Sequence, residues 1–469
     1  MPSSGPIDVF VDSSLRLIEL EREAEVEESA RLHASLSAAE LEKRGVSLLR
    51  LKVADELAGL GGRTLLVLEP TREGDLPSHR FQAGDIAALR PAGGSGKSGA
   101  GRGGPGADAP TGVVFRVTPH RITVALDDVP DEPLEEPLRI DRVANDITYR
   151  RMREALGRLR GYGRGPAARL REVLFGLRGP EFGKPRALDA LDPALDASQR
   201  EAVAFAREAR DIALIHGPPG TGKTTAAVEL IRQAVRRGER VLACAPSNIA
   251  TDNLVERLAA WGTRVVRMGH PARLLPSVVE HSLDALVEEA EGTRIAASVR
   301  RELEGVHRKL RRTASRAERR ALRDDLRRLR AEIREVEDRA VRDVISSAEV
   351  VLATNTGAGE SVLGDFEFDL VVIDEAAQAI EAACWIPLLK ARRAVLSGDH
   401  RQLPPTIRSR EAERGGLGVT LFDRLASRYA DAITRMLTVQ YRMHERIMEW
   451  PSRELYEGRL EAHPSVARH

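Results

Sequence analysis

The feature that most constrains this chain is a glycine-rich segment, Gly217-Pro-Pro-Gly-Thr-Gly-Lys-Thr-Thr225, which lies between an apolar run and an amphipathic stretch. It fits G-x-x-x-x-G-K-[ST], the pattern of a strand-to-helix loop that binds phosphate through backbone N–H groups and the helix N-terminus. Lys223 adds a positive charge for the phosphates, and the Thr224 hydroxyl suits Mg²⁺. A chance glycine-rich turn is the alternative, and the strand–loop–helix context disfavours it. The predicted nucleotide-binding residues are Gly217, Pro218, Pro219, Gly220, Thr221, Gly222, Lys223, Thr224 and Thr225.

A second pattern, Leu370-Val-Val-Ile-Asp-Glu-Ala-Ala-Gln378, ends an apolar strand in two carboxylates. Open α/β sheets bind ligands at the carboxyl ends of their strands. Asp374 is therefore predicted to hold Mg²⁺, and Glu375 to orient and deprotonate an attacking water. An ordinary acidic helix N-terminus is the alternative, since the helix dipole favours it too. Combined with the phosphate loop, the pair predicts Mg²⁺-dependent hydrolysis of a nucleoside triphosphate.

The chain from Ile212 onward alternates buried-type strands with amphipathic helical stretches. The strand patterns are IALIH, VLACA, VVLAT, LVVID and AVLSG. Such alternation is typical of a parallel sheet with helices on both faces, so the expected fold class is α/β. A helical insertion is predicted at about 270–346, and the Lys/Arg-rich face Arg308–Arg330 within it is either a strand-binding surface or an ordinary solvated face.

The residues before this sheet predict a separate accessory unit. Residues 1–45 are charged and predict a stalk helix, and helical pattern returns over 149–185 as a second stalk helix and linker. Between them, residues 46–148 contain five short runs rich in β-branched and aliphatic residues, which predict a small β-barrel. The segment 91–110 within it is nearly all Gly, Ala, Ser and Pro, so a flexible insert is expected. Its Gly-Lys-Ser lacks a flanking strand and helix, and is not taken as a phosphate loop.

Composition narrows the class of protein. Lys and Arg number 72 against 71 Asp and Glu, a net charge of +1, so any nucleic-acid surface must come from local patches. Two cysteines exclude a disulfide framework and a cysteine-rich zinc site. The start of the chain has neither a basic nor an apolar leader region, and no apolar run approaches about 18 residues. We therefore expect a soluble, cytoplasmic protein with no membrane partner.

Four motifs in this order, GPPGTGKTT, VIDEAAQA, SGDHRQLPPT and VQYRMH, resemble those of superfamily 1 helicases. The resemblance is closest to the up-frameshift and immunoglobulin-μ-binding-protein group, the five-prime-to-three-prime subclass, and it covers almost the whole chain. It implies a RecA-like first ATPase domain over 186–432, with the barrel on its stalk and the helical insertion as accessory parts. It also implies an ATP-dependent DNA/RNA helicase whose cofactors are ATP and Mg²⁺.

The resemblance assigns further roles around the nucleotide. Gln199 corresponds to a glutamine that recognises adenine, although Ser198 as a helix N-cap explains the same segment equally well. Gln402 corresponds to the γ-phosphate sensor, with an ordinary polar loop residue as the alternative. Tyr441 and Arg442 match residues that stack on the base and contact the γ-phosphate, where an arginine stabilises charge on the transferring phosphoryl group.

Two loops match the strand-binding loops of the family. They follow the VLACA and VVLAT runs, and their Ser, Asn and Thr side chains and amides can bond phosphates without reading sequence. Helix-capping loops are the alternative. The predicted nucleic-acid residues are Pro246, Ser247, Asn248, Thr354, Thr356 and Gly357. The expected partner is single-stranded DNA or RNA, with no preference readable between them.

The pattern departs from the family near its end. Only 27 residues follow Arg442, whereas a second RecA-like domain needs on the order of 150. Residues 433–469 are thus expected to be the start of a truncated second domain, and a second polypeptide is a possible source of the rest. Unwinding is therefore in doubt, and an ATP-switched single-strand-binding module without motor activity is the alternative. A kinase built on the same loop is disfavoured because no acceptor pocket is evident.

Overall fold

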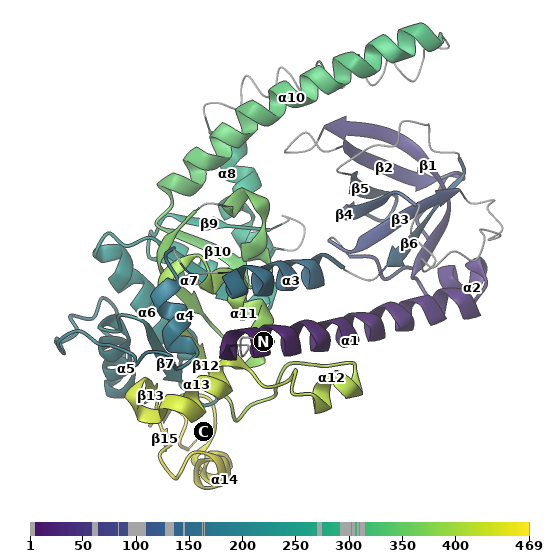
Figure 1. The fold of residues 1–469 in the computed structure, drawn as a ribbon. Coiled ribbons are helices and arrows are strands. Elements are labelled where there is room, and N and C mark those ends of the chain that lie inside the picture. The colour runs from purple at the N-terminus through teal and green to yellow at the C-terminus, as the bar shows by residue number, and fades with distance from the viewer. Residues whose placement is uncertain are drawn as a thin grey trace.

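The chain is described from a computed structural model, in which the rest of the fold is arranged around one parallel sheet (Figure 1). The described residues are 5–58, 64–82, 84–91, 109–126, 136–143, 146–161, 163, 165–269, 274–290, 302, 305, 306, 309, 315–364 and 366–468. Within them, no helix combines the length and the apolar character needed to cross a membrane.

The central sheet has seven strands, all parallel, in the order β13-β7-β12-β11-β8-β10-β9. The strands are β7 (Ile212–His216), β8 (Val241–Ala245), β9 (Val265–Arg267), β10 (Val350–Thr354), β11 (Phe368–Ile373), β12 (Ala391–Gly398) and β13 (Thr434–Met436). The expected α/β class is confirmed, and all five predicted strands are present. Strands β9 and β13 were not predicted, because three residues are too few to show a period.

Helices cover both faces of the sheet and bury two separate apolar clusters. One face carries α5 (Ala197–Arg207), α6 (Lys223–Arg236) and α7 (Asn248–Ala260). The other face carries α4 (Ala168–Leu174), α11 (Glu381–Leu388) and α13 (Leu421–Tyr429). This burial on both sides explains why the sheet strands read as continuous apolar runs instead of alternating ones.

The accessory unit is a closed antiparallel barrel in the order β1-β2-β5-β4-β3-β6. The strands are β1 (Ser47–Ala58), β2 (Thr64–Pro70), β3 (Ile86–Pro91), β4 (Thr111–Val117), β5 (Ile122–Leu126) and β6 (Leu138–Val143). Among the described residues the barrel therefore has six strands, and the expectation of five was wrong. Strand β6 escaped the sequence reading because charged residues interrupt it; the buried Asp141 accepts hydrogen bonds from Arg139 and Ser47. Residues 92–108, most of the predicted insert 91–110, lie outside the described residues.

The stalk consists of α1 (Pro6–Ser35) and α3 (Asp146–Gly161), which pack against each other and carry the barrel at one end (Figure 1). The pattern of the N-terminal segment predicted one helix, but the segment forms two. Ser37 caps a second helix, α2 (Ala38–Lys43), through a capping box with Glu40, and this ends the first helix.

The predicted insertion 270–346 contains a 3₁₀ turn (Pro276–His281), α8 (Leu283–Glu289) and the long helix α10 (Arg316–Ser347), which extends away from the sheet (Figure 1). Residues 270–273 and 291–301, and most of 303–314, lie outside the described residues. So do several side chains of the basic face Arg308–Arg330, whose role stays a prediction.

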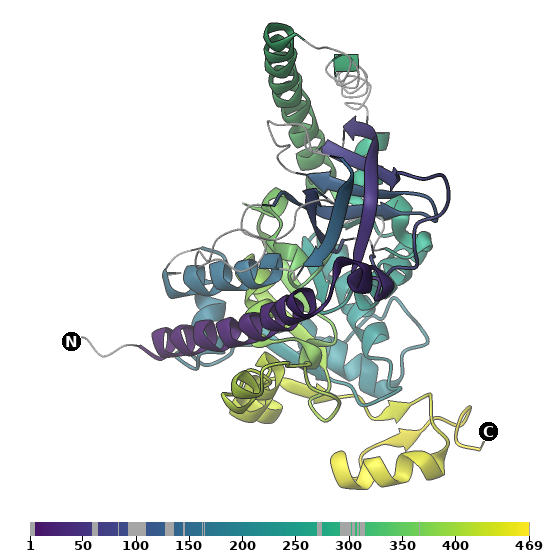
Figure 2. The ribbon, with the colours of Figure 1, turned by 90° about the vertical axis from the view of Figure 1, so that its right-hand side faces the viewer.

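The C-terminal segment first completes the main sheet and then leaves it. After the short helix α12 (Arg410–Arg414) and α13, strand β13 pairs with β7, so the domain bound predicted at 433 falls at the edge of the first sheet. The chain then forms β14 (Val439–Gln440), α14 (Glu445–Leu455) and β15 (Glu461–Ala462). These three elements, here called the C-terminal unit, make a second, two-stranded parallel sheet that stands at one end of the molecule (Figure 2).

Candidate active site and nucleic-acid loops

The predicted motifs meet at one edge of the central sheet. Each of the five strands that carry them ends at this edge, because all seven strands run in the same direction. Strand β7 leads into the glycine-rich loop, β8 into Pro246, β10 into the loop after Thr354, β11 into Asp374 and β12 into Asp399. The site can therefore be assembled from short segments that are far apart in the sequence.

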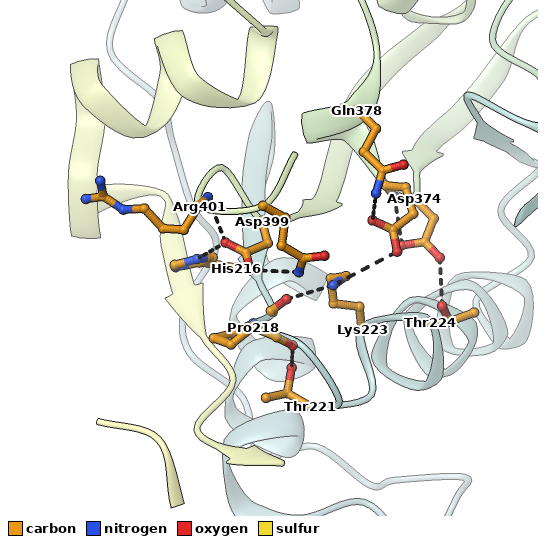
Figure 3. A network of polar contacts seen from close by, with 12 residues as sticks. His216, Pro218, Thr221, Lys223, Thr224, Asp374, Gln378, Asp399 and Arg401 are labelled. Carbon is orange, nitrogen blue, oxygen red and sulfur yellow. Dashed lines mark hydrogen bonds and ion pairs between the residues drawn. The ribbon is translucent and has the colours of Figure 1, made fainter. Parts of the chain in front are cut away.

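The glycine-rich loop forms a tight cradle between β7 and α6 (Figure 3). Gly217 N donates to the carbonyl of Gly398 at 3.0 Å, which ties the loop to the neighbouring strand β12. Gly222 adopts φ 77° at the N-cap of α6, a left-handed conformation that favours glycine. Lys223 opens the helix, and its Nζ donates to the Gly217 carbonyl at 2.8 Å across the loop. The ammonium group thus lies inside the cradle.

Thr224 and Asp374 form the predicted metal pair. Thr224 Oγ1 donates to Asp374 Oδ2 at 2.9 Å, although the two residues are 150 positions apart. Asp374 is 1% exposed, directly after β11. A hydroxyl and a carboxylate are the oxygen ligands that Mg²⁺ prefers, so this donor set fits the expected cofactor.

Glu375 has the features of a strained and activated carboxylate. Its backbone is left-handed, with φ 52° and ψ 36°, and such strain in a residue other than glycine is concentrated at functional sites. Its Oε1 lies 4.0 Å from Lys223 Nζ, and its Oε2 accepts from Gln378 Nε2 at 3.3 Å. Burial raises the pKa of Glu375 above its usual value, and Lys223 offsets only part of that rise. A raised pKa suits a general base.

These residues line a cavity of about 270 Å³. The lining residues are Pro218, Gly220, Thr221, Gly222, Lys223, Thr224, Thr225, Arg257, Glu375, Tyr441 and Arg442. Sequence reasoning missed Arg257, which reaches the cavity from α7 and donates to Thr225 Oγ1 at 3.0 Å. No local pattern marks it, because α7 and the loop meet only in the folded chain.

Tyr441 and Arg442 lie over the glycine-rich loop, and their predicted contacts with the base and the γ-phosphate stay predictions. Tyr441 N donates to the Gly220 carbonyl at 2.9 Å, and its hydroxyl donates to Asp196 Oδ2 at 3.1 Å. A Cβ on Gly220 would lie 2.6 Å from the Arg442 Cβ, so the segment after β14 packs directly on the loop. The arginine of the VQYRMH motif is thereby brought to the cavity.

Gln402 lies beside the cavity and is not among its lining residues. Its Nε2 donates to Asp399 Oδ2 at 2.8 Å, and its role as a γ-phosphate sensor stays a prediction. Burial opposes ionisation of Asp399, but hydrogen bonds from His216, Gln402, Arg401 N and Tyr456 outweigh it and hold its pKa well below the usual range.

Gln199 is buried behind the glycine-rich loop, at 4% exposure. Its Nε2 donates to the Thr221 carbonyl at 3.0 Å, and its Oε1 accepts from Asp196 N at 3.1 Å. The N-cap of α5 is Asp196, not Ser198 as the alternative had it. Both polar atoms of Gln199 are thus used to hold the loop and the cap, and adenine recognition by this residue stays a prediction.

The first of the two candidate strand-binding loops contains a capping bond of the kind that the alternative interpretation proposed, whereas Thr356, the N-cap residue in the second loop, makes no side-chain capping bond. Ser247 caps α7 by accepting from Ala250 N at 3.2 Å, with the half-buried Pro246 just before it, and Asn248 Oδ1 accepts from Arg267 Nη2 at 3.0 Å. Capping uses the Ser247 acceptor, yet the exposed loop still lies at the same edge of the sheet as the cavity.

The second loop is held from outside the ATPase domain. Thr354 Oγ1 accepts from Gly357 N at 3.0 Å, and the Thr356 carbonyl accepts from Arg151 Nη1 of α3 at 2.9 Å. Sequence reasoning missed Arg151, because its partner lies 205 residues away. The stalk therefore contacts a loop that is predicted to bind nucleic acid.

Comparisons with known families agree with this arrangement. Residues 11–142 match the family described as "Helicase SMUBP-2/HCS1, 1B domain", and residues 194–410 and 417–469 match two families described as "AAA domain". "DNA polymerase alpha-associated DNA helicase A" of Schizosaccharomyces pombe is 34% identical over 97% of this chain and 69% of its own length. The chain belongs to the SMUBP-2 and up-frameshift-like superfamily 1 helicases.

Other relatives extend the same picture. "DNA-binding protein SMUBP-2" of Mus musculus is 45% identical over the whole chain, which covers 47% of that protein. "Uncharacterized ATP-dependent helicase MJ0104" of Methanocaldococcus jannaschii is 36% identical over 75% of the chain. The chain thus spans about half the length of the SMUBP-2 relatives that it matches. The family expected from the four motifs is confirmed. The 1B match, residues 11–142, covers nearly all of the barrel and also most of α1.

Proposed function

We propose that this chain binds Mg²⁺-ATP in the cavity at the sheet edge and hydrolyses it, as the ATPase part of a DNA/RNA helicase with five-prime-to-three-prime polarity. The observation that carries the proposal is the meeting of two motifs: the Thr224 hydroxyl lies 2.9 Å from Asp374, and Lys223 Nζ lies 4.0 Å from Glu375 Oε1. Bound at Thr224 and Asp374, Mg²⁺ would neutralise charge on the phosphates.

The residues of the chain would divide the work as follows. Lys223 and the loop amides would hold the β- and γ-phosphates. Glu375 would orient and deprotonate the attacking water. Arg442 would stabilise negative charge on the transferring phosphoryl group, since it lines the same cavity.

Single-stranded DNA or RNA is the proposed partner. The loops after β8 and β10 open at the same edge of the sheet as the cavity, and relatives of the chain are named as DNA-binding and helicase proteins. We further propose that unwinding needs a second motor unit, for which a second polypeptide is one source, because the described part of the C-terminal unit contributes a sheet of two strands.

The test is to replace Glu375 with Gln. We expect Glu375→Gln to keep ATP affinity, because the loop and Lys223 are intact, and to lower turnover at least about 100-fold through loss of the base. Glu367→Gln, an exposed glutamate just before β11, is the matched control and should turn over ATP like the wild type. Wild-type turnover in Glu375→Gln would refute the assignment.

A nucleotide-switched binding module is the second candidate, and the bond of Gln402 to Asp399 outside the cavity favours it. In that case strand affinity would change with nucleotide, while turnover of the wild type stayed at the level of Glu375→Gln. Fluorescence anisotropy with a labelled single strand, beside a phosphate-release assay, separates the two candidates.

A further inference from the structure

The buried carboxylate of Asp399 joins three segments of the chain, two of which, at His216 and Arg401, are drawn in Figure 3. It is 2% exposed, directly after β12, and accepts four hydrogen bonds. His216 Nε2, at the end of β7, and Arg401 N each lie 3.0 Å from Oδ1. Gln402 Nε2 and the Tyr456 hydroxyl each lie 2.8 Å from Oδ2. The candidate sensor and Tyr456 therefore share one acceptor oxygen.

Tyr456 connects this acceptor to the C-terminal unit. It follows α14 directly, is 3% exposed and packs with Met448 and Leu460 in the small core of that unit. The same segment of chain contacts the glycine-rich loop through Tyr441 N and the Gly220 carbonyl. A shift of the C-terminal unit would thus change the contacts of Asp399 as well as those of the glycine-rich loop.

The shared oxygen sets the cost of moving Gln402. Gln402 is not among the residues that line the cavity, so its side chain must turn to reach a γ-phosphate there. A turn that breaks its bond to Asp399 Oδ2 removes a donor from a buried carboxylate oxygen, which is costly. Tyr456 donates to the same oxygen, so that oxygen stays satisfied when Gln402 leaves. With Tyr456 removed, Gln402 becomes the one described side-chain donor on Oδ2, and its release is disfavoured.

We propose that Tyr456 is a positioning residue for Gln402: by donating to their shared acceptor, it frees the Gln402 amide to recognise the terminal phosphate of ATP. This links the seating of the C-terminal unit to the discrimination between nucleoside triphosphate and diphosphate. The inference rests on the proposed function in so far as Gln402 is the γ-phosphate contact.

The test measures the affinity of the full chain for Mg²⁺-bound β,γ-imido-ATP and for Mg²⁺-ADP. In wild type the ratio of the two affinities should favour the triphosphate analogue. Tyr456→Phe removes one hydroxyl and should lower this ratio about tenfold, the effect of one hydrogen bond to a charged group. Tyr429→Phe is the matched control: its hydroxyl donates to the Val173 carbonyl away from the site, and the ratio should not change.

A double-mutant cycle separates a positioning role from a structural one. If Tyr456 acts through Gln402, then Gln402→Ala should lower the ratio similarly, and Tyr456→Phe should lower it no further in that background. An unchanged ratio in Tyr456→Phe, or independent additive losses, would overturn the inference. A shifted ratio with no wild-type turnover would sustain it while refuting hydrolysis, and no nucleotide binding in any variant would refute both.

Discussion

Two loops at the same sheet edge are held by different parts of the molecule. The nucleotide loop is held by Gln199 of α5, through the Thr221 carbonyl, and by the Tyr441 amide just before the C-terminal helix. The loop after β10 is held by Arg151 of the stalk, through the Thr356 carbonyl. The proposed nucleotide side is thus tied to the C-terminal unit, and the proposed strand-binding side to the stalk that carries the barrel.

The stalk makes a second contact with the ATPase domain. Glu21 of α1 is 4% exposed, and its carboxylate accepts from the backbone N–H groups of Arg408 and Ser409 at 2.8 to 3.0 Å. These residues follow the Gln402 loop. A movement of the barrel can therefore reach the ATPase domain through two stalk helices without passing through the glycine-rich loop.

The largest expected effect comes from removing the charge inside the nucleotide loop. Lys223→Ala should lower ATP turnover by roughly 100- to 1,000-fold, because Lys223 is the cation placed for the transferring phosphate. Single-strand affinity measured without nucleotide should be unchanged if the two sides are anchored separately. Lys184→Ala, at an exposed position, is the control. If Lys223→Ala lost strand affinity as strongly as turnover, the two loops would not be anchored separately.

Two glycines, Gly222 and Gly238, test whether Gln199 packs tightly against the glycine-rich loop. Gly222 and Gly238 have nearly equal φ, 77° and 76°, so alanine costs similar backbone strain at each. A Cβ on Gly222 would lie 2.5 Å from Gln199 Nε2, whereas one on Gly238 meets no atom within 4 Å. Only Gly222→Ala should lose ATP affinity, by about tenfold or more. Equal affinities by calorimetry would show that Gln199 does not press on the loop.

The strand side should respond to the stalk alone. Arg151→Ala removes the bond to the Thr356 carbonyl and should weaken single-strand affinity by roughly 2- to 10-fold, with ATP affinity unchanged. Arg150→Ala, the neighbouring exposed arginine on α3, is the matched control. Anisotropy titrations with a labelled strand and with a labelled ATP analogue measure the two affinities. A loss of ATP affinity in Arg151→Ala would show that the stalk contact also acts on the nucleotide loop.

The smallest expected effect is a pH dependence at Asp399. Its pKa in the folded chain is depressed, so its stabilisation is complete above the unfolded pKa of about 4 and is lost as pH falls towards the lower folded pKa. Asp399→Asn should therefore melt below the wild type at pH 6, and the difference should shrink as the pH falls below about 4. A constant difference between pH 6 and 3 would contradict a depressed pKa.

Sequence reasoning succeeded where the chemistry is local. The glycine-rich loop, Asp374 and Glu375 each lie in a short pattern that also fixes the strand before it, so their meeting at one edge followed from the parallel sheet. Strand β6 of the barrel was missed because buried ion pairs conceal its alternation.

What sequence could not supply were partners fixed by tertiary contacts. The contacts of the Gln199 amide with the loop and the cap were not predicted, and its role at the adenine stays a prediction. Arg257, Arg151 and Tyr456 carry no local signature, since each acts on an atom from a different element. In this chain the residues proposed to carry the chemistry lie in short sequence motifs, whereas the residues that contact and position them lie outside such motifs.

The proposed strand-stimulated ATP hydrolysis is tested most directly by measuring ATP turnover of this chain, with and without single-stranded DNA or RNA, beside Glu375→Gln. We expect a single strand to raise turnover well above its level without strand, and Glu375→Gln to show no such rise. Wild-type turnover that is unaffected by either strand and equal to that of Glu375→Gln would contradict the proposal.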